Sequence, residues 1–293
     1  RTLREVKPIG LDQSGFEIIC NEVQLRWVKV GYIKKLASRG GPFPRQQDLN
    51  PDGFHVGLPP GRTFSLSHGW VSEMHPGPSG AKLQRLVAQL ESLGADPERD
   101  GVFLDYSSLP QKSFDHLPEA YFQANNAPTP MQDRTPMERW KFDIAMWEMT
   151  RLYAFFKCEV IVDPVIDLAQ DFSADDSASG LKWVSIGTNR PSSGREIANE
   201  ALAKALEDQM KANPEATASP EVTLTLEEWQ GFGIENLHPA DYVKSVGNYF
   251  QPILGDWGFI NRRPYGERGW CCAEFSVALR NNRIVNLHDP QVQ

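Results

Sequence analysis

The 293-residue sequence lacks long apolar runs, and none of its segments approaches the ~20 consecutive apolar residues that a membrane-spanning helix needs. It also lacks a charged-then-apolar leader of the signal-peptide type, although it begins with Arg1 and not with Met. Positive charge is in deficit, since 38 acidic residues against 30 Lys and Arg give a formal net charge of −8. This balance argues against general nucleic-acid or anionic-membrane binding. We therefore expect neither nucleic acid nor membrane as a partner.

Cysteine is also scarce, and its spacing excludes a disulfide framework. The four cysteines are Cys20, Cys158, Cys271 and Cys272. Adjacent cysteines rarely bridge to each other, and Cys158 lies in an apolar segment typical of a buried strand, so we expect free thiols and a reducing, cytoplasmic setting. No zinc-ligand spacing, Gly-x-Ser-x-Gly elbow or kinase signature is present, and we expect no bound metal.

The sequence does contain the alternation of an α/β protein. Short apolar runs at 63–67, 101–105 and 158–162 predict neighbouring parallel strands, and an i, i+3, i+4 stripe of leucines predicts a helix over 81–93. A second long helix is expected over 137–156, with Trp140, Ile144 and Trp147 as its core stripe. We expect three layers, with a mainly parallel central sheet between helices.

The remaining segments suggest how the chain is divided. We expect residues 1–61 to be an N-terminal extension packed on the core, with a helix over 17–36, and residues 62–293 to be the α/β domain. Residues 164–262 read as a large insertion with helices at 197–210 and 239–250, and small, polar or Pro-containing stretches at 173–180 and 213–220. A last strand is expected at 283–287.

Polar residues follow the predicted strands at one edge of the sheet, where open parallel sheets bind ligands. The residues in that position are Ser67, His68 and Gly69, then Asp105, Tyr106 and Ser107, and finally Asp163. Each also has an ordinary structural role open to it. His68 could simply end its strand, and the aspartates could serve turns or helix caps.

A further acid comes near the start of the helix that begins around residue 269. Trp270 precedes Glu274 by one helical turn, so both lie on one face. The first turn of a helix favours a carboxylate, and the preceding loop is rich in Gly, Pro and Arg. Glu274 is thus a candidate catalytic group, or an acid that only stabilises the helix start beside a buried Trp.

The order of these motifs resembles that of Toll/interleukin-receptor-like (TIR-like) domains. Phe64-Ser65-Leu66-Ser67-His68 is similar to the family's first strand and Val102-Phe103-Leu104-Asp105 to its second. Trp270-Cys271-Cys272-Ala273-Glu274-Phe275 resembles the Trp-Cys-Leu-x-Glu-Leu motif of its third helix. The stretches 44–49, Ser67-His68-Gly69-Trp70 and 108–111 are similar to parts of large uncharacterised microbial TIR-like proteins.

This resemblance implies a flavodoxin-like fold and, in catalytic members, cleavage of the nicotinamide–ribose bond of NAD, which is then substrate and not cofactor. By the same match Glu274 is the catalytic carboxylate. Ser67, His68, Gly69 and Trp70, with Asp105, Tyr106, Ser107 and Trp270, are the implied substrate-binding residues, and the 105–111 loop closes over the nucleotide. Self-association through TIR-like surfaces is also implied.

Two departures are visible beside the resemblance. The chain is about twice the usual length of a TIR domain, and the glycine usual after the second strand is missing. Two alternatives therefore stay open, namely a non-catalytic interaction module and an enzyme similar to nucleoside deoxyribosyltransferases, in which an analogous glutamate attacks the sugar.

Overall fold

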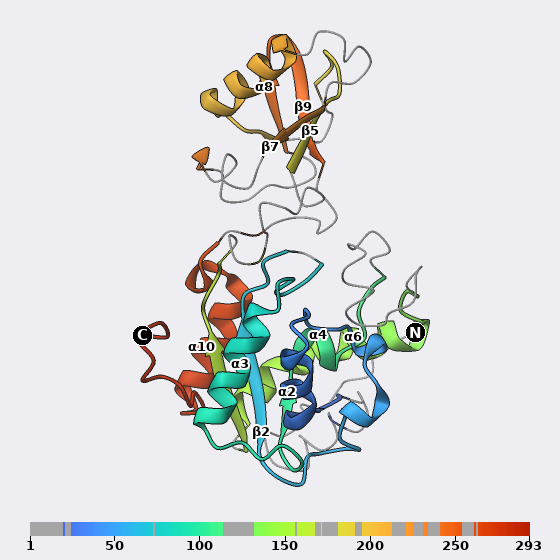
Figure 1. The fold of residues 1–293 in the computed structure, drawn as a ribbon, viewed down its shortest axis with the longest axis vertical. Coiled ribbons are helices and arrows are strands. Elements are labelled where there is room, and N and C mark those ends of the chain that lie inside the picture. The colour runs from blue at the N-terminus through green and yellow to red at the C-terminus, as the bar shows by residue number, and fades with distance from the viewer. Residues whose placement is uncertain are drawn as a thin grey trace, which may run out of the picture.

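The core of the protein is a four-stranded, mainly parallel sheet (Figure 1). The computed structural model describes residues 20, 25–72, 74–113, 132–155, 157–167, 171, 181–190, 195–212, 221–224, 231–233, 241–253, 261 and 263–293. Strand β2 (Thr63–His68) lies between β3 (Gly101–Phe103) and β4 (Cys158–Asp163), and both neighbours run parallel to it. The predicted parallel neighbours are therefore confirmed.

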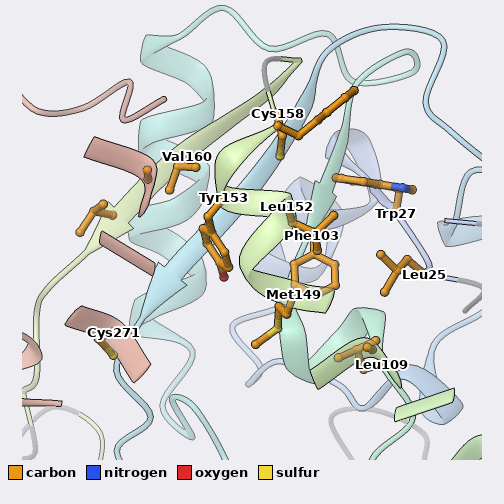
Figure 2. Close-up of a cluster of buried hydrophobic side chains, with 14 of the residues drawn as sticks. Leu25, Trp27, Phe103, Leu109, Met149, Leu152, Tyr153, Cys158, Val160 and Cys271 are labelled. Atoms are coloured by element: carbon orange, nitrogen blue, oxygen red, sulfur yellow. The ribbon is translucent and has the colours of Figure 1, made fainter. Parts of the chain in front are cut away.

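Helices cover both faces of this sheet. Because side chains alternate along a strand, Phe64 and Leu66 of β2 face one side, with α2 (Val30–Ser38) and α3 (Ala81–Ser92) packed over them. The opposite face of the sheet packs against α6 (Pro136–Ala154) and α10 (Gly269–Arg280). Figure 2 shows part of this second cluster, in which side chains of α6 lie against β3 and β4. The chain is thus a mixed α/β protein with helices on both faces of its mainly parallel sheet.

Helix α6 uses a different face for packing from the one the sequence suggested. Thr135 caps it with a capping box, and Pro136 occupies its first turn. Its buried residues are Ala145, Met149, Leu152 and Tyr153. Trp140 is 51% exposed and Trp147 83% exposed, so the predicted core stripe is wrong for the two tryptophans, whereas Ile144 is partly buried and packs against the core. The helix is apolar on more than one face, and spacing alone could not choose between them.

The predicted N-terminal extension contributes a strand to the core sheet. β1 (Val28–Lys29) pairs antiparallel with β3 and leads directly into α2. The predicted helix over 17–36 is therefore wrong for residues 25–29, and residues 17–19 and 21–24 lie outside the described part of the chain. In a helix, the backbone N–H and C=O groups of these residues would bond to one another. Here they bond to β3 instead, so β1 forms an edge of the sheet.

After α2 the chain forms two short 3₁₀ helices, η1 (Gln46–Asp48) and η2 (Pro51–Gly53), and the segment around η1 supports the loop that follows β3. That loop begins with the short helix α4 (Asp105–Ser108). The guanidinium of Arg45 forms a buried ion pair with Asp48 at 2.9 Å and donates to the backbone oxygens of Lys112 and Gln132. Gln46 donates to the Ser108 oxygen at 2.7 Å. These bonds hold the 105–112 loop in a fixed position.

The predicted last strand at 283–287 is reduced to a single parallel bridge between Ile284 and Val160. Beyond it, the Asn286 side chain takes over the role of a strand backbone. Its amide accepts from the Val162 nitrogen at 3.0 Å and donates to the Val162 oxygen at 2.8 Å. The prediction failed because a side-chain amide continues the ladder at this edge of β4.

The predicted insertion contains a second sheet, drawn apart from the core sheet in Figure 1. Its strand order is β6-β8-β9-β5-β7. The elements are β5 (Leu181–Ser185), β6 (Arg195–Glu196), α8 (Glu200–Ala212), β7 (Glu221–Leu224), β8 (Asp241–Ser245) and β9 (Asn248–Ile253). Helix α8 matches the expected amphipathic helix and buries Leu202 and Leu206. The stretches 173–180 and 213–220 lie outside the described residues.

The helix predicted over 239–250 is wrong. Residues 241–253 form an antiparallel hairpin whose turn is Val246-Gly247, with φ of 45° and 80°. Two consecutive positive φ values match the twist of the flanking strands, and Gly247 adopts its value without strain. The Tyr242-Val243 pair and Tyr249-Phe250, aromatic and β-branched residues on either side of a short polar turn, were the overlooked strand signal.

All four cysteines are free, as expected. Burial raises the pKa of the Cys158 and Cys271 thiols to about 12. Among the residues that the structure describes, no helix combines the length and apolar character needed to cross a membrane.

Candidate functional site

A cavity of about 350 Å³ opens beyond the carboxyl ends of β2 and β3. This volume lies within the usual range of small-molecule sites, roughly 300–1,000 Å³. The cavity has aromatic and thioether walls and a small set of polar groups. Its lining residues are His68, Trp70, Asp105, Leu109, Gln111, Phe142, Met146, Met149, Asn261, Arg268, Trp270, Cys271 and Glu274.

Glu274 reaches this cavity from α10 and is only 4% exposed. It lies in the second turn of the helix and not in the first, so the expected dipole stabilisation of a helix start does not apply. Trp270 lines the same cavity, as expected from its spacing, but it is 43% exposed and is not a buried anchor.

A line of hydroxyl groups leads to the Glu274 carboxyl group. The Ser67 hydroxyl donates to Glu274 Oε2 at 2.5 Å, and the Tyr265 hydroxyl lies 2.6 Å from the same serine oxygen. Since Ser67 has one proton and gives it to Glu274, Tyr265 donates to Ser67. Tyr265 belongs to the 3₁₀ helix η4 (Tyr265–Glu267), which immediately precedes α10. Ser67 thus contacts the Glu274 carboxyl group but does not itself line the cavity.

The environment of Glu274 favours its protonated form. Burial raises the pKa of this carboxyl group from 4.5 to about 8, and the nearby charge of Asp105 adds to the rise. Hydrogen bonds from Ser67, Tyr153 and Trp270 act in the opposite direction and lower the pKa. Such a shift marks a candidate functional acid when the group also lies in a cleft, as Glu274 does.

Asp105 is the second carboxylate of the cavity, and three N–H groups converge on it. The Trp70 indole donates to Oδ2 at 2.7 Å, and the Tyr106 backbone nitrogen donates to Oδ1 at 2.7 Å. The third partner is His68 Nε2, 3.1 Å from Oδ1. The Gln111 side chain donates to the Asp105 backbone oxygen at 3.0 Å, which joins the two ends of the 105–111 loop.

His68 is 6% exposed and lines the cavity from the end of β2. Because a carboxylate only accepts hydrogen bonds, the Nε2 atom facing Asp105 carries the proton. Its other ring nitrogen, Nδ1, is buried and has no hydrogen-bond partner among the described residues.

Arg268 fixes the outer wall of the cavity. Its guanidinium donates to three backbone oxygens, those of Trp70, Asn261 at 2.9 Å and Arg263 at 2.7 Å. Burial lowers the pKa of Arg268. Gly69 allows this close approach, since a Cβ at that position would meet the Arg268 guanidinium at 2.9 Å.

The structure brings together five of the residues selected from the sequence, since His68, Trp70, Asp105, Trp270 and Glu274 all line the cavity. Ser67, Gly69, Tyr106 and Ser107 do not line it. Tyr106 is buried against the rings of Trp70 and His75, and the Ser107 hydroxyl donates to the Pro44 oxygen at 2.7 Å.

Asp163 belongs to a different cluster, beside α3. It pairs with Arg85 at 3.0 Å, and the fully buried Lys82 lies 3.7 Å away. Burial lowers the pKa of Lys82. Asp163 also lines a separate cavity of about 230 Å³ formed by α3, β4 and the C-terminal segment.

Several lining residues were not singled out from the sequence. Phe142, Met146 and Met149 follow one another at i, i+4 and i+7 on α6, and this stripe was a usable signal. Arg268 lies two residues before Trp270, but its bonds to the backbone of the cavity wall appear only in the folded chain. Asn261 carried no sequence signal, because only the folded chain brings it next to Arg268.

Within the described residues, no group of three or more His, Cys, Asp and Glu side chains could hold a metal ion. The polar groups of the cavity instead suit an organic ligand with a cationic or hydrogen-bonding part, since aromatic rings and two carboxyl groups surround it. Comparison with protein-family models, curated proteins and solved structures finds no match for this chain.

Proposed function

We propose that the core of this chain is a TIR-like, flavodoxin-like domain that hydrolyses the nicotinamide–ribose bond of NAD or a related nucleotide. Glu274 is the catalytic carboxylate of this reaction. The observation that carries the proposal is the burial of Glu274 at an aromatic-walled cavity beyond the carboxyl ends of β2 and β3. The first parallel strand lies between the second and third, an order with which flavodoxin-like sheets begin, and this supports the fold assignment.

The reaction suits one buried carboxylate. The nicotinamide ring of NAD is cationic and leaves as a neutral base, so its departure needs little acid catalysis. Positive charge then develops on the ribose, and a nearby carboxylate stabilises it. With a pKa of about 8, only about a tenth of Glu274 is ionised at pH 7. A bound cation favours the ionised form and lowers that pKa.

Incubating the purified chain with NAD is expected to release free nicotinamide, detected by chromatography. NADH is the matched control substrate, because its dihydronicotinamide ring is neutral and would have to leave as an anion. We expect release from NAD and none from NADH under the same conditions. Absence of release from NAD would overturn the proposed activity.

A second candidate function is a non-catalytic interaction module. The exposed Trp140 and Trp147 on α6 favour it, since exposed apolar patches mark interaction sites. In that case α6 supplies a self-association surface and the cavity stays unused. Failure of NAD cleavage by the unmutated protein would favour this function over the enzyme.

A further inference from the structure

Two buried hydroxyl groups outside the cavity connect to the Glu274 carboxyl group. Ser67 donates to Glu274 Oε2 at 2.5 Å, and the Tyr265 hydroxyl lies 2.6 Å from Ser67 Oγ. Ser67 is fully buried, and Tyr265 is 8% exposed. Neither residue lines the cavity, whereas Glu274 does. Any effect of the two hydroxyl groups on a reaction in the cavity therefore passes through Glu274.

The fold holds this line of groups from two sides. Ser67 belongs to β2, which lies between β3 and β4, and it pairs with Val162 of β4. Tyr265 belongs to η4, which immediately precedes α10 and its Glu274. The Tyr265 hydroxyl also lies 3.4 Å from the backbone oxygen of Cys271, in the first turn of α10. The central strand and the start of α10 thus fix the distances between the two hydroxyl groups and the acid.

The protons of the two hydroxyl groups point along this line toward the acid. Ser67 has a single proton, which it gives to Glu274, and its oxygen accepts from Tyr265. Donors in series polarise one another, which strengthens the last bond of the line. A bond donated to an ionised carboxylate is stronger than one donated to a neutral group. The line therefore stabilises ionised Glu274 more than protonated Glu274.

We propose that Ser67 and Tyr265 are positioning residues, which orient the Glu274 carboxyl group and stabilise its ionised form for the cleavage step. This inference rests on the proposed function, in which the ionised carboxylate stabilises positive charge on the ribose. A charged group that is already held in place needs no rearrangement when that charge develops. The resemblance implied that Ser67 contacts the substrate, whereas in this proposal it acts on the acid.

The other titratable groups near Glu274 come from α4, α6 and α10. The charge of Asp105, whose carboxylate lies 3.1 Å from His68 Nε2, raises the Glu274 pKa, whereas a hydrogen bond from Tyr153 lowers it. Burial raises the pKa of Tyr153, and it raises the pKa of the Cys271 thiol to about 12. The pKa of the tyrosine in the hydroxyl line is raised in the same way. Both tyrosines and the thiol therefore stay neutral at pH 6–9.5, the ~3.5-unit range in which Glu274 titrates.

The test replaces Ser67 by Ala in the full chain and measures kcat/KM for nicotinamide release from NAD against pH. A hydrogen bond to a charged group is worth about one to two pKa units, so we expect the pKa in the profile to rise by that amount. At pH 7 the variant is then about 10–100-fold slower than the unmutated protein. At pH 9.5, where most of Glu274 is ionised in both proteins, the difference narrows to about fivefold or less.

Tyr265→Phe is the second variant, because it removes only a hydroxyl group that does not touch Glu274. We expect a smaller rise of the same pKa, by about half a unit to one unit. The loss is then about 3–10-fold at pH 7 and within about twofold at pH 9.5.

Ser65→Ala is the matched control for the loss of a buried serine hydroxyl. Ser65 lies two residues earlier on the same face of β2 and is also fully buried. Its hydroxyl contacts Cys158 Sγ at 2.9 Å and not Glu274. We expect its pH profile to have the pKa of the unmutated protein.

Each outcome decides the proposal. An unchanged pKa in both Ser67→Ala and Tyr265→Phe overturns it, because the hydroxyl groups then do not act on Glu274. A loss of the same factor at pH 7 and pH 9.5 also overturns it, since damage to the fold or to substrate binding gives that pattern. If the unmutated protein releases no nicotinamide, the proposed function fails and this inference falls with it. Release by the unmutated protein with unshifted variant profiles refutes the inference alone.

Discussion

Replacing Glu274 by Gln is expected to reduce nicotinamide release by at least about 10²–10³-fold, the usual effect of removing one group that stabilises transition-state charge. Gln has nearly the same shape and still accepts the hydrogen bond from Ser67, but it can never carry the negative charge that the ribose requires. The measurement is kcat/KM for nicotinamide release from NAD.

Glu98→Gln is the control for this change, because Glu98 is exposed and does not line the cavity. It should leave both activity and stability unchanged. Turnover of Glu274→Gln equal to that of the unmutated protein would remove Glu274 from the reaction. It would also favour the interaction module as the function of the chain.

The same substitution is expected to make the protein more stable at alkaline pH. Glu274 titrates near 4.5 in the unfolded chain and at about 8 in the folded protein. The folded state therefore binds the proton more tightly. The stabilisation that comes from this proton on Glu274 is complete below pH 4.5 and is lost progressively as the pH rises to about 8. Gln has no proton to lose, so Glu274→Gln lacks this loss.

The expected difference in unfolding free energy between Glu274→Gln and the unmutated protein is small at pH 4.5. At pH 8.5 we expect the variant to be more stable by a few kcal/mol, on the order of 5–10 °C in Tm. Thermal unfolding of both proteins at the two pH values measures it. The comparison cancels the other titrating groups, which both proteins share. An equal difference in Tm at pH 4.5 and pH 8.5 would show that Glu274 is not the buried, high-pKa acid described above.

Much of the parallel core could be predicted from local patterns. The strands β2, β3 and β4 are short apolar runs, and α3 has an unambiguous leucine stripe closed by Gly94 with φ of 62°. Each of these segments has one face or none in contact with water, so the pattern and the structure agree. Where two faces of a segment are apolar, as on α6, the pattern did not decide which face is buried.

Two of the errors have the same physical cause, namely partners distant in sequence. The residues before α2 form a strand because β3 offers its edge, and the 283–287 segment gives way to a side-chain ladder from Asn286. The hairpin of β8 and β9 depends on positive φ at Val246, which a valine adopts only when the surrounding strands impose it. Local propensity carries none of this information.

The candidate site was predictable where polar residues directly follow strands. His68 and Asp105 belong to this group, and Glu274 was found through its spacing from Trp270. The raised pKa of Glu274 was not predictable, because it arises from burial and from the charge of Asp105. The orphan Nδ1 of His68 was equally hidden, since it depends on which nitrogen faces Asp105 in the folded chain.

The most direct test of the central claim is the pH dependence of kcat/KM for nicotinamide release from NAD. This quantity reports the ionisation of the free enzyme. If ionised Glu274 is the working group, kcat/KM rises about tenfold per pH unit at acidic and neutral pH and levels off near pH 8, where Glu274 titrates. A profile that is flat between pH 6 and 8, or one that falls as the pH rises, would contradict a catalytic carboxylate at this position.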